Sequence, residues 1–160
     1  VLLICPKPLV TNWAREFQLW APEIPVAVVE GNRARRNWQW RQPATPVMLA
    51  NYELLIRDAH ITADDAPHFD LVVLDEAQRI KNRHSATSQI ARSIRRTRSW
   101  ALTGTPVENS PEDLVGIFEF LGSKDNNIVM ASKFEDKNSV PTLFTFGAIK
   151  TPWDPDPARL

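Results

Sequence analysis

Residues 69–78 read FDLVVLDEAQ, an apolar run that ends in two adjacent carboxylates. Its unbroken Leu and Val residues are typical of a strand that is buried on both faces of a parallel sheet. Asp75 and Glu76 would then lie at the carboxyl end of that strand, where open α/β sheets bind their ligands. Asp75 is suited to hold Mg²⁺, and Glu76 to orient or deprotonate a water that attacks a terminal phosphate. A helix N-cap followed by a first-turn carboxylate is the structural alternative.

A second apolar run ends in a similar polar turn, because residues 100–109 read WALTGTPVEN. Gly104 allows the backbone to approach closely or to adopt a positive φ. The hydroxyl groups of Thr103 and Thr105 can reach neighbouring carboxylates or a phosphate-bound water. An ordinary strand-to-helix turn, with Pro106 ending the strand, is the alternative for this segment taken alone.

The rest of the chain alternates apolar runs with helical patterns. We expect strands at residues 1–5, 25–30, 47–50, 71–74 and 100–102. Leu9, Trp13, Phe17 and Trp20 recur at spacings that place them on one face of a helix. This alternation predicts right-handed βαβ crossovers and a parallel sheet covered on both faces. Because parallel strands end at one edge, the polar segments that follow four of them should share one crevice: residues 6–7, 51–52, 75–76 and 103–105.

Composition limits the class of protein. A length of 160 residues supports one domain, and 43% hydrophobic with 24% charged residues is typical of a globular chain. Cys5 is the only cysteine, so an internal disulfide is excluded. No segment approaches the length of a transmembrane span, so no membrane partner is expected. The net charge of zero argues against non-specific affinity spread over the whole surface.

Basic residues are nevertheless unevenly distributed. Between positions 79 and 98 there is no carboxylate, and the basic side chains are Arg79, Lys81, Arg83, Arg92, Arg95, Arg96 and Arg98. A second group interleaves arginine with tryptophan and comprises Arg33, Arg35, Arg36, Trp38, Trp40 and Arg41. The first group is either a phosphate-contacting surface, with salt-sensitive affinity, or a solvated helix face. For the second we favour a surface helix, because base stacking belongs to single-strand binders.

Several of these segments resemble the Swi/Snf-type ATPases, which are DEAD/DEAH-like, DNA-dependent ATPases of helicase superfamily two. Residues 75–82 (DEAQRIKN) and 102–109 (LTGTPVEN) resemble motifs II and III of that family. Residues 2–13 (LLICPKPLVTNW) resemble its motif Ia, and residues 51–55 (NYELL) the element that follows. Residues 117–121 (IFEFL) resemble the helix after motif III. The likeness covers roughly residues 1–121 in the family's order and spacing.

The resemblance implies a fold, cofactors and site residues. Residues 1–121 would form part of an N-terminal RecA-like helicase ATP-binding domain, a partial P-loop NTPase domain, with residues 122–160 as a divergent or irregular tail. The implied cofactors are ATP and Mg²⁺. Asp75 and Glu76 would be catalytic, with Asp75 on the metal. Nucleotide coupling would fall to Gln78, Thr103, Gly104 and Thr105. Contacts to DNA would fall to Lys7, Asn51, Tyr52, Lys81 and Asn82.

The chain departs from the family at two points. Many members have His at the position of Gln78; Gln still donates and accepts hydrogen bonds but carries no pH-dependent charge. No G-x-x-x-x-G-K-[ST] phosphate cradle occurs in the sequence. We therefore expect an internal piece whose cradle precedes Val1, and an isolated chain that hydrolyses no ATP.

The resemblance implies, for the parent protein, an ATP-dependent translocase on double-stranded DNA that remodels DNA-bound proteins. A polymerase or a nucleoid or chromatin protein would be such a partner. The implied location is the cytoplasm, in association with the nucleoid, in a bacterium and the nucleus in a eukaryote. A non-catalytic domain that binds DNA or a polymerase and only retains the fold is the alternative. A Gly-Lys-Thr or Gly-Lys-Ser encoded upstream would separate the two.

Overall fold

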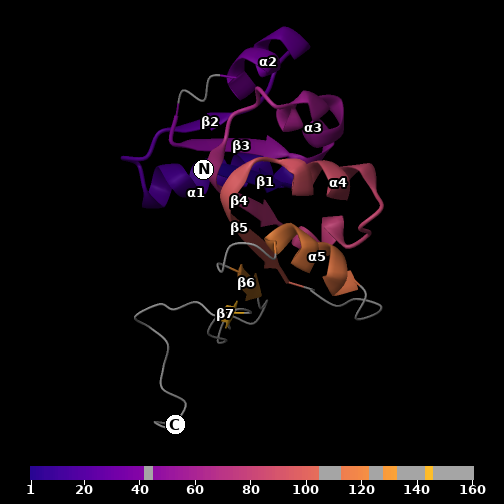
Figure 1. The fold of residues 1–160 in the computed structure, drawn as a ribbon. Coiled ribbons are helices and arrows are strands. Elements are labelled where there is room, and N and C mark those ends of the chain that lie inside the picture. Colours follow the sequence, from indigo (N-terminus) through magenta and orange to yellow (C-terminus); the bar gives the residue numbers. More distant parts are fainter. Residues whose placement is uncertain (42–44, 105–112, 123–127, 133–142, 146–160) are drawn as a thin grey trace.

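A computed structural model describes residues 1–41, 45–104, 113–122, 128–132 and 143–145. These residues form a sheet of seven strands in the order β2-β3-β1-β4-β5-β6-β7 (Figure 1). All neighbouring pairs are parallel except β6 and β7, which are antiparallel. The strands are β1 (Leu2–Cys5), β2 (Val26–Val28), β3 (Val47–Asn51), β4 (Phe69–Asp75), β5 (Arg96–Thr103), β6 (Ile128–Ser132) and β7 (Leu143–Thr145).

Helices cover both faces of this sheet, which confirms the predicted α/β fold class. They are α1 (Val10–Trp20), α2 (Arg33–Arg41), α3 (Tyr52–Arg57), α4 (Ala86–Ser93) and α5 (Asp113–Leu121). Short 3₁₀ turns, η1 (Lys7–Leu9), η2 (Ala59–Thr62) and η3 (Ala77–Ile80), lie between them. No helix within the described ranges is long and apolar enough to cross a membrane.

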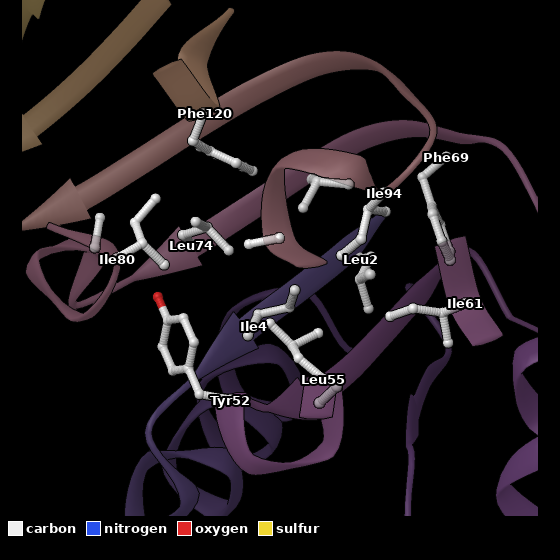
Figure 2. Packing of buried hydrophobic residues seen from close by; sticks show 14 of the residues in the cluster. Leu2, Ile4, Tyr52, Leu55, Ile61, Phe69, Leu74, Ile80, Ile94 and Phe120 are labelled. Atoms are coloured by element: carbon white, nitrogen blue, oxygen red, sulfur yellow. The ribbon is translucent and has the colours of Figure 1, made fainter. Parts of the chain in front are cut away.

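Alternation along the strands divides the core into two layers, because successive side chains point to opposite faces. The larger layer joins Leu2 and Ile4 of β1 to α2, α3, α4 and α5. Figure 2 shows Leu55, Ile80 and Phe120 in this layer, with the Tyr52 hydroxyl pointing toward Ile80.

The smaller layer joins the sheet to α1. Leu3 and Cys5 pack there against Leu9, Trp13 and Phe17, as the helical spacing predicted. Trp20 does not share this packing: it is 78% exposed, and its indole nitrogen donates to a Glu16 carboxylate oxygen at 2.8 Å.

A buried ion pair ties α2 to the end of α3. Asp58 is fully buried and accepts hydrogen bonds from Arg36 Nε at 2.7 Å and Arg36 Nη2 at 2.8 Å. The Trp40 indole donates to the same carboxylate at 3.0 Å. Such bidentate, charge-assisted contacts fix geometry as well as charge, so the Arg/Trp segment is anchored to the domain by its own side chains.

A second, partly buried arginine connects α4, β5 and α5. Arg96 donates to the Ser99 hydroxyl at 2.7 Å and to the carbonyl oxygens of Ile94 at 2.7 Å and Phe120 at 2.6 Å. Its guanidinium carbon lies 4.3 Å from the centroid of the Phe120 ring. Burial lowers the pKa of Arg96 to about 10. The charge is directed at the carbonyl ends of two helices, where cations are favourable.

Gly116 lets α5 lie directly against the turn that follows the two carboxylates. A Cβ atom at this position would stand 2.4 Å from the Ile80 carbonyl oxygen and 2.6 Å from that of Lys81. Both oxygens belong to backbone, which cannot move aside as a flexible side chain could. The close approach of α5 to η3 therefore requires a residue without a side chain at position 116.

Gly116→Ala is expected to lower the free energy of unfolding by about 1–3 kcal/mol, the usual range for overpacking. Helix propensity alone predicts the opposite sign, a gain of about 1 kcal/mol. Chemical denaturation separates the two, with Val115→Ala on the same helix as a control because Val115 is 38% exposed. A stabilised Gly116→Ala variant would contradict the close contact.

Candidate functional site

The carboxyl ends of four parallel strands meet at one edge of the sheet. Cys5 at the end of β1 is in register with Asn51 of β3, and Asp75 at the end of β4 is in register with Leu102 of β5. Strands β1 and β4 are themselves neighbours. The polar segments that follow these strands therefore lie along one rim.

This rim contains a topological switch point. After β1 the chain enters α1 on one face of the sheet, whereas after β4 it enters η3 and α4 on the other face. Adjacent strands whose connections leave in opposite directions open a crevice between them, and open α/β sheets bind ligands there. The structure has a pocket of about 210 Å³ at this place, lined by Leu9, Asn12, Trp13, Glu16 and Asp75.

Asp75 forms the inner wall of this pocket and is fully buried. Its Oδ2 accepts a hydrogen bond from the Trp13 indole nitrogen at 2.7 Å, and its Oδ1 accepts one from the Glu76 backbone N–H at 3.0 Å. Its main-chain carbonyl accepts from the Tyr52 hydroxyl at 2.9 Å. Groups from α1 and α3 thus converge on the last residue of β4.

Glu76 has an uncommon backbone conformation. With φ 53° and ψ 52°, it is the one non-glycine residue with positive φ in the described part of the chain. Such conformations cost roughly 1–3 kcal/mol and cluster at functional sites. The turn directs the chain away from the strand into η3 while the carboxylate stays beside the rim.

Glu76 belongs to a hydrogen-bonded chain of three side chains. Gln78 Nε2 donates to Glu76 Oε2 at 2.9 Å, and the Thr103 hydroxyl donates to Gln78 Oε1 at 2.7 Å. Thr103 is fully buried at the end of β5. The Gln78 amide therefore uses its donor and its acceptor at once and links the ends of β4 and β5. Gly104 follows and is exposed; Thr105 lies outside the described residues.

The residues with expected DNA contacts are more dispersed. Lys7 and Asn82 are exposed. The Asn51 side chain caps α3 by accepting from Leu54 N–H at 3.2 Å, and Lys81 is partly buried. Tyr52 is only 3% exposed; burial raises the pKa of its phenol well above 10, and the charge of Asp75 adds to this effect. The structure thus brings Tyr52 to Asp75 and leaves Lys7 and Asn82 at the surface.

Comparison with known proteins decides the family. The model of the SNF2-related domain matches this sequence over residues 1–150. The chain belongs to the SNF2-related domain family. The resemblance that the motifs carry to Swi/Snf-type ATPases is thereby confirmed.

Relatives within this family come from bacteria, archaea and eukaryotes. The ISWI chromatin-remodeling complex ATPase ISW2 of Saccharomyces cerevisiae is 36% identical over 124 residues. An uncharacterized ATP-dependent helicase of Mycoplasma genitalium is 35% identical over 120 residues. Each alignment covers 75% of this chain and 11% of the relative. The SWI2/SNF2 ATPase core of Sulfolobus solfataricus in complex with dsDNA superposes with a TM-score of 0.66 at 31% identity, covering 76% of this chain and 24% of that chain.

The donor set of this SNF2-related domain fits a nucleotide-bound Mg²⁺ better than a metal held by protein alone. The described residues contain no group of three or more His, Cys, Asp and Glu side chains that could hold a metal. Mg²⁺ commonly takes one or two carboxylates and completes its shell with water and phosphate oxygens. Asp75 at the pocket wall, with Glu76 adjacent, matches that pattern.

Much of the basic run after β4 serves internal contacts in this SNF2-related domain. Arg83 and Arg92 both pair with Glu119, at 2.8 and 2.9 Å. Arg79 lies 3.6 Å from Glu53, and Arg96 is held inside as described above. The Arg79 pair joins η3 to α3, and the pairs with Glu119 join Arg83 and α4 to α5. Neither interpretation of the basic run made from the sequence included these internal contacts.

Trp13 is the site residue that the sequence did not reveal. Its spacing from Leu9 and Phe17 fully accounts for it as a packing residue of α1. Nothing local in the sequence indicates that its N–H reaches a carboxylate 62 positions away.

Proposed function

We propose that this chain supplies the magnesium-binding and water-activating part of an ATP hydrolase that translocates on double-stranded DNA. The observation that supports the proposal is the hydrogen-bonded rim in which Thr103, Gln78 and Glu76 stand beside Asp75. The relatives named as ATPases and as an ATP-dependent helicase support the same class of activity.

Each rim residue has a role that follows from its contacts. Asp75 would hold Mg²⁺, which supplies electrostatic stabilisation to the transferring phosphate when it is bound. Glu76 would orient or deprotonate the attacking water, with Gln78 fixing one of its carboxylate oxygens. Thr103 couples that glutamine to the end of β5. A displacement of the β5 end would therefore move the water-activating carboxylate. This coupling provides a path for nucleotide state to reach Gly104 and Thr105, which follow β5 in the sequence.

Double-stranded DNA is the proposed track. The solved SWI2/SNF2 core that this chain resembles was obtained with dsDNA. Lys7 follows β1, Asn51 ends β3, and Lys81 and Asn82 follow η3. All four lie in segments that resemble the family's DNA-side motifs. Tyr52 would act indirectly, because it is buried against the Asp75 carbonyl. The protein that is displaced from DNA would be a polymerase or a nucleoid or chromatin protein, in the nucleoid or nucleus according to the cell.

The test is ATP hydrolysis by the full-length protein that carries this chain, measured as phosphate release while duplex DNA is titrated. We expect the rate to rise several-fold with duplex and much less with a single strand of the same length. The 160-residue chain alone should hydrolyse no ATP above background, because the cradle lysine that contacts the β- and γ-phosphates is not among its residues. Duplex binding by the full-length protein without hydrolysis would instead support the non-catalytic binding domain.

A further inference from the structure

Trp13 contacts the residue at the centre of the proposed metal site. Its indole Nε1 lies 2.7 Å from Asp75 Oδ2, and both residues line the pocket at the switch point. The ring also packs against Phe17, with centroids 6.2 Å apart and planes tilted by 40°. Trp13 thus has an apolar side in the small core layer and a polar atom directed into the pocket.

The chemistry of the indole makes this contact specific. The indole N–H of tryptophan can only donate, so the contact requires an acceptor, which here is the Asp75 carboxylate oxygen. The χ2 torsion of aspartate is broad and roughly two-fold, so a carboxylate without lateral contacts can rotate. Asp75 is held on both oxygens, by Trp13 N–H on Oδ2 and by Glu76 N–H on Oδ1. Each carboxylate oxygen has two lone pairs, so a hydrogen bond and a metal or metal-bound water can share one oxygen.

We propose that Trp13 is a positioning residue for Asp75: its indole N–H sets the carboxylate plane that receives nucleotide-bound Mg²⁺. The inference rests on the proposed function, since it assigns a supporting role within the same site. It goes further by linking the metal carboxylate to α1. That helix is the element of the smaller core layer, on the face opposite η3 and α4, so a shift of α1 would turn the carboxylate.

Trp13→Phe removes the donor and keeps an aromatic ring against Phe17. Loss of a hydrogen bond to a metal ligand typically lowers metal affinity 10- to 100-fold. In the full-length protein with a non-hydrolysable ATP analogue, we expect the Kd for Mn²⁺, measured by electron paramagnetic resonance, to rise at least about tenfold. The Mg²⁺ concentration for half-maximal ATP hydrolysis should rise in parallel, while kcat at saturating Mg²⁺ changes little.

Trp38→Phe is the matched control. Trp38 lies on α2, is 56% exposed and is not among the residues that line the pocket. This variant should bind Mn²⁺ as the wild type does. A purely structural loss in Trp13→Phe would lower the amount of folded protein and kcat at every Mg²⁺ concentration without moving the midpoint of the Mg²⁺ titration.

A second measurement does not depend on the stability of the variant. In wild-type protein with ¹⁵N-labelled tryptophan, Mg²⁺ added with the ATP analogue should shift one indole signal, identified as the one missing in Trp13→Phe or Trp13→Tyr. Wild-type Mn²⁺ affinity in Trp13→Phe, or an unshifted Trp13 signal, overturns the inference. If hydrolysis persists, those results leave the proposed function standing. If the full-length protein binds Mn²⁺ and nucleotide but does not hydrolyse ATP, only the proposed function is contradicted.

Discussion

Replacing Glu76 with glutamine is expected to lower kcat for ATP hydrolysis by the full-length protein about 10²- to 10⁴-fold, the usual contribution of a positioned general base. Gln keeps the length of the side chain and an oxygen that can accept from Gln78 Nε2, the present partner of Glu76 at 2.9 Å. It loses the basic carboxylate that would take a proton from the attacking water. Nucleotide and duplex binding should therefore persist. Steady-state phosphate release, together with fluorescent nucleotide binding, measures both.

Glu53→Gln is the control for this variant. The Glu53 carboxylate is half exposed and lies 3.6 Å from Arg79, an arrangement that contributes little in solvent. Its loss should leave kcat within a factor of about two, as expected of a surface change. Hydrolysis in Glu76→Gln at the wild-type rate would remove residue 76 from the chemistry and transfer the role of base to another group.

Asp58→Ala is expected to destabilise the α2–α3 region by about 3–5 kcal/mol, the effect of removing one partner from a buried ion pair. The change leaves the Arg36 guanidinium, of which only 12% of the side chain is exposed, without the carboxylate that accepts two of its hydrogen bonds. Hydrogen exchange followed by mass spectrometry measures this locally, since exchange reports the opening of separate parts of a structure. The amides of α2 and α3 should lose protection while those of α5 retain it.

Asp65→Ala is the matched control. Asp65 lies 3.7 Å from Arg41, and Arg41 is on α2 together with Arg36. Both side chains of the Asp65–Arg41 pair are about two-thirds exposed. Surface pairs of this kind contribute about 0–1 kcal/mol. Equal loss of protection in Asp58→Ala and Asp65→Ala would contradict the prediction that the buried ion pair stabilises this region more than the exposed one does.

The effect of Asp58 should depend on pH in a defined direction. Burial raises the pKa of Asp58, but hydrogen bonds from Arg36 and Trp40 outweigh it and hold that pKa below its usual range. A lowered pKa stabilises the fold above the unfolded value of about 3.9 and loses the contribution as pH falls through the folded value. Wild type and Asp58→Ala should therefore differ fully at neutral pH and converge in strong acid.

The sequence predicts the edge of the sheet because the necessary information is local. Each strand is an apolar run followed by a polar turn, and parallel pairing then places the turns together. The α/β fold class and the common edge of Asn51, Asp75 and Thr103 were recovered in this way. The helical spacing wrongly predicted that Trp20 packs on the sheet. Trp20 is the last residue of α1 and lies beyond the part of the helix that packs on β1 and β3.

The contacts that shape the site could not be predicted in the same way, because they join distant positions. Trp13 and Tyr52 reach Asp75 across 62 and 23 residues, and no local spacing encodes either contact. From the sequence, the basic run between residues 79 and 98 was compatible with either a phosphate-contacting surface or a solvated helix face. Its carboxylate partners Glu53 and Glu119 lie outside that run in sequence and become neighbours only in the folded chain.

If Glu76 activates the attacking water as proposed, its left-handed backbone conformation (φ 53°) opposes stability to activity at a single position. A glycine there would adopt the same φ without a clash between Cβ and backbone, so the turn itself favours a residue that has no carboxylate. Selection for stability would then favour glycine at this position, whereas selection for ATP turnover would favour glutamate. In a copy of this domain that does not need to hydrolyse nucleotide, glycine at position 76 would stabilise the fold at no cost to function.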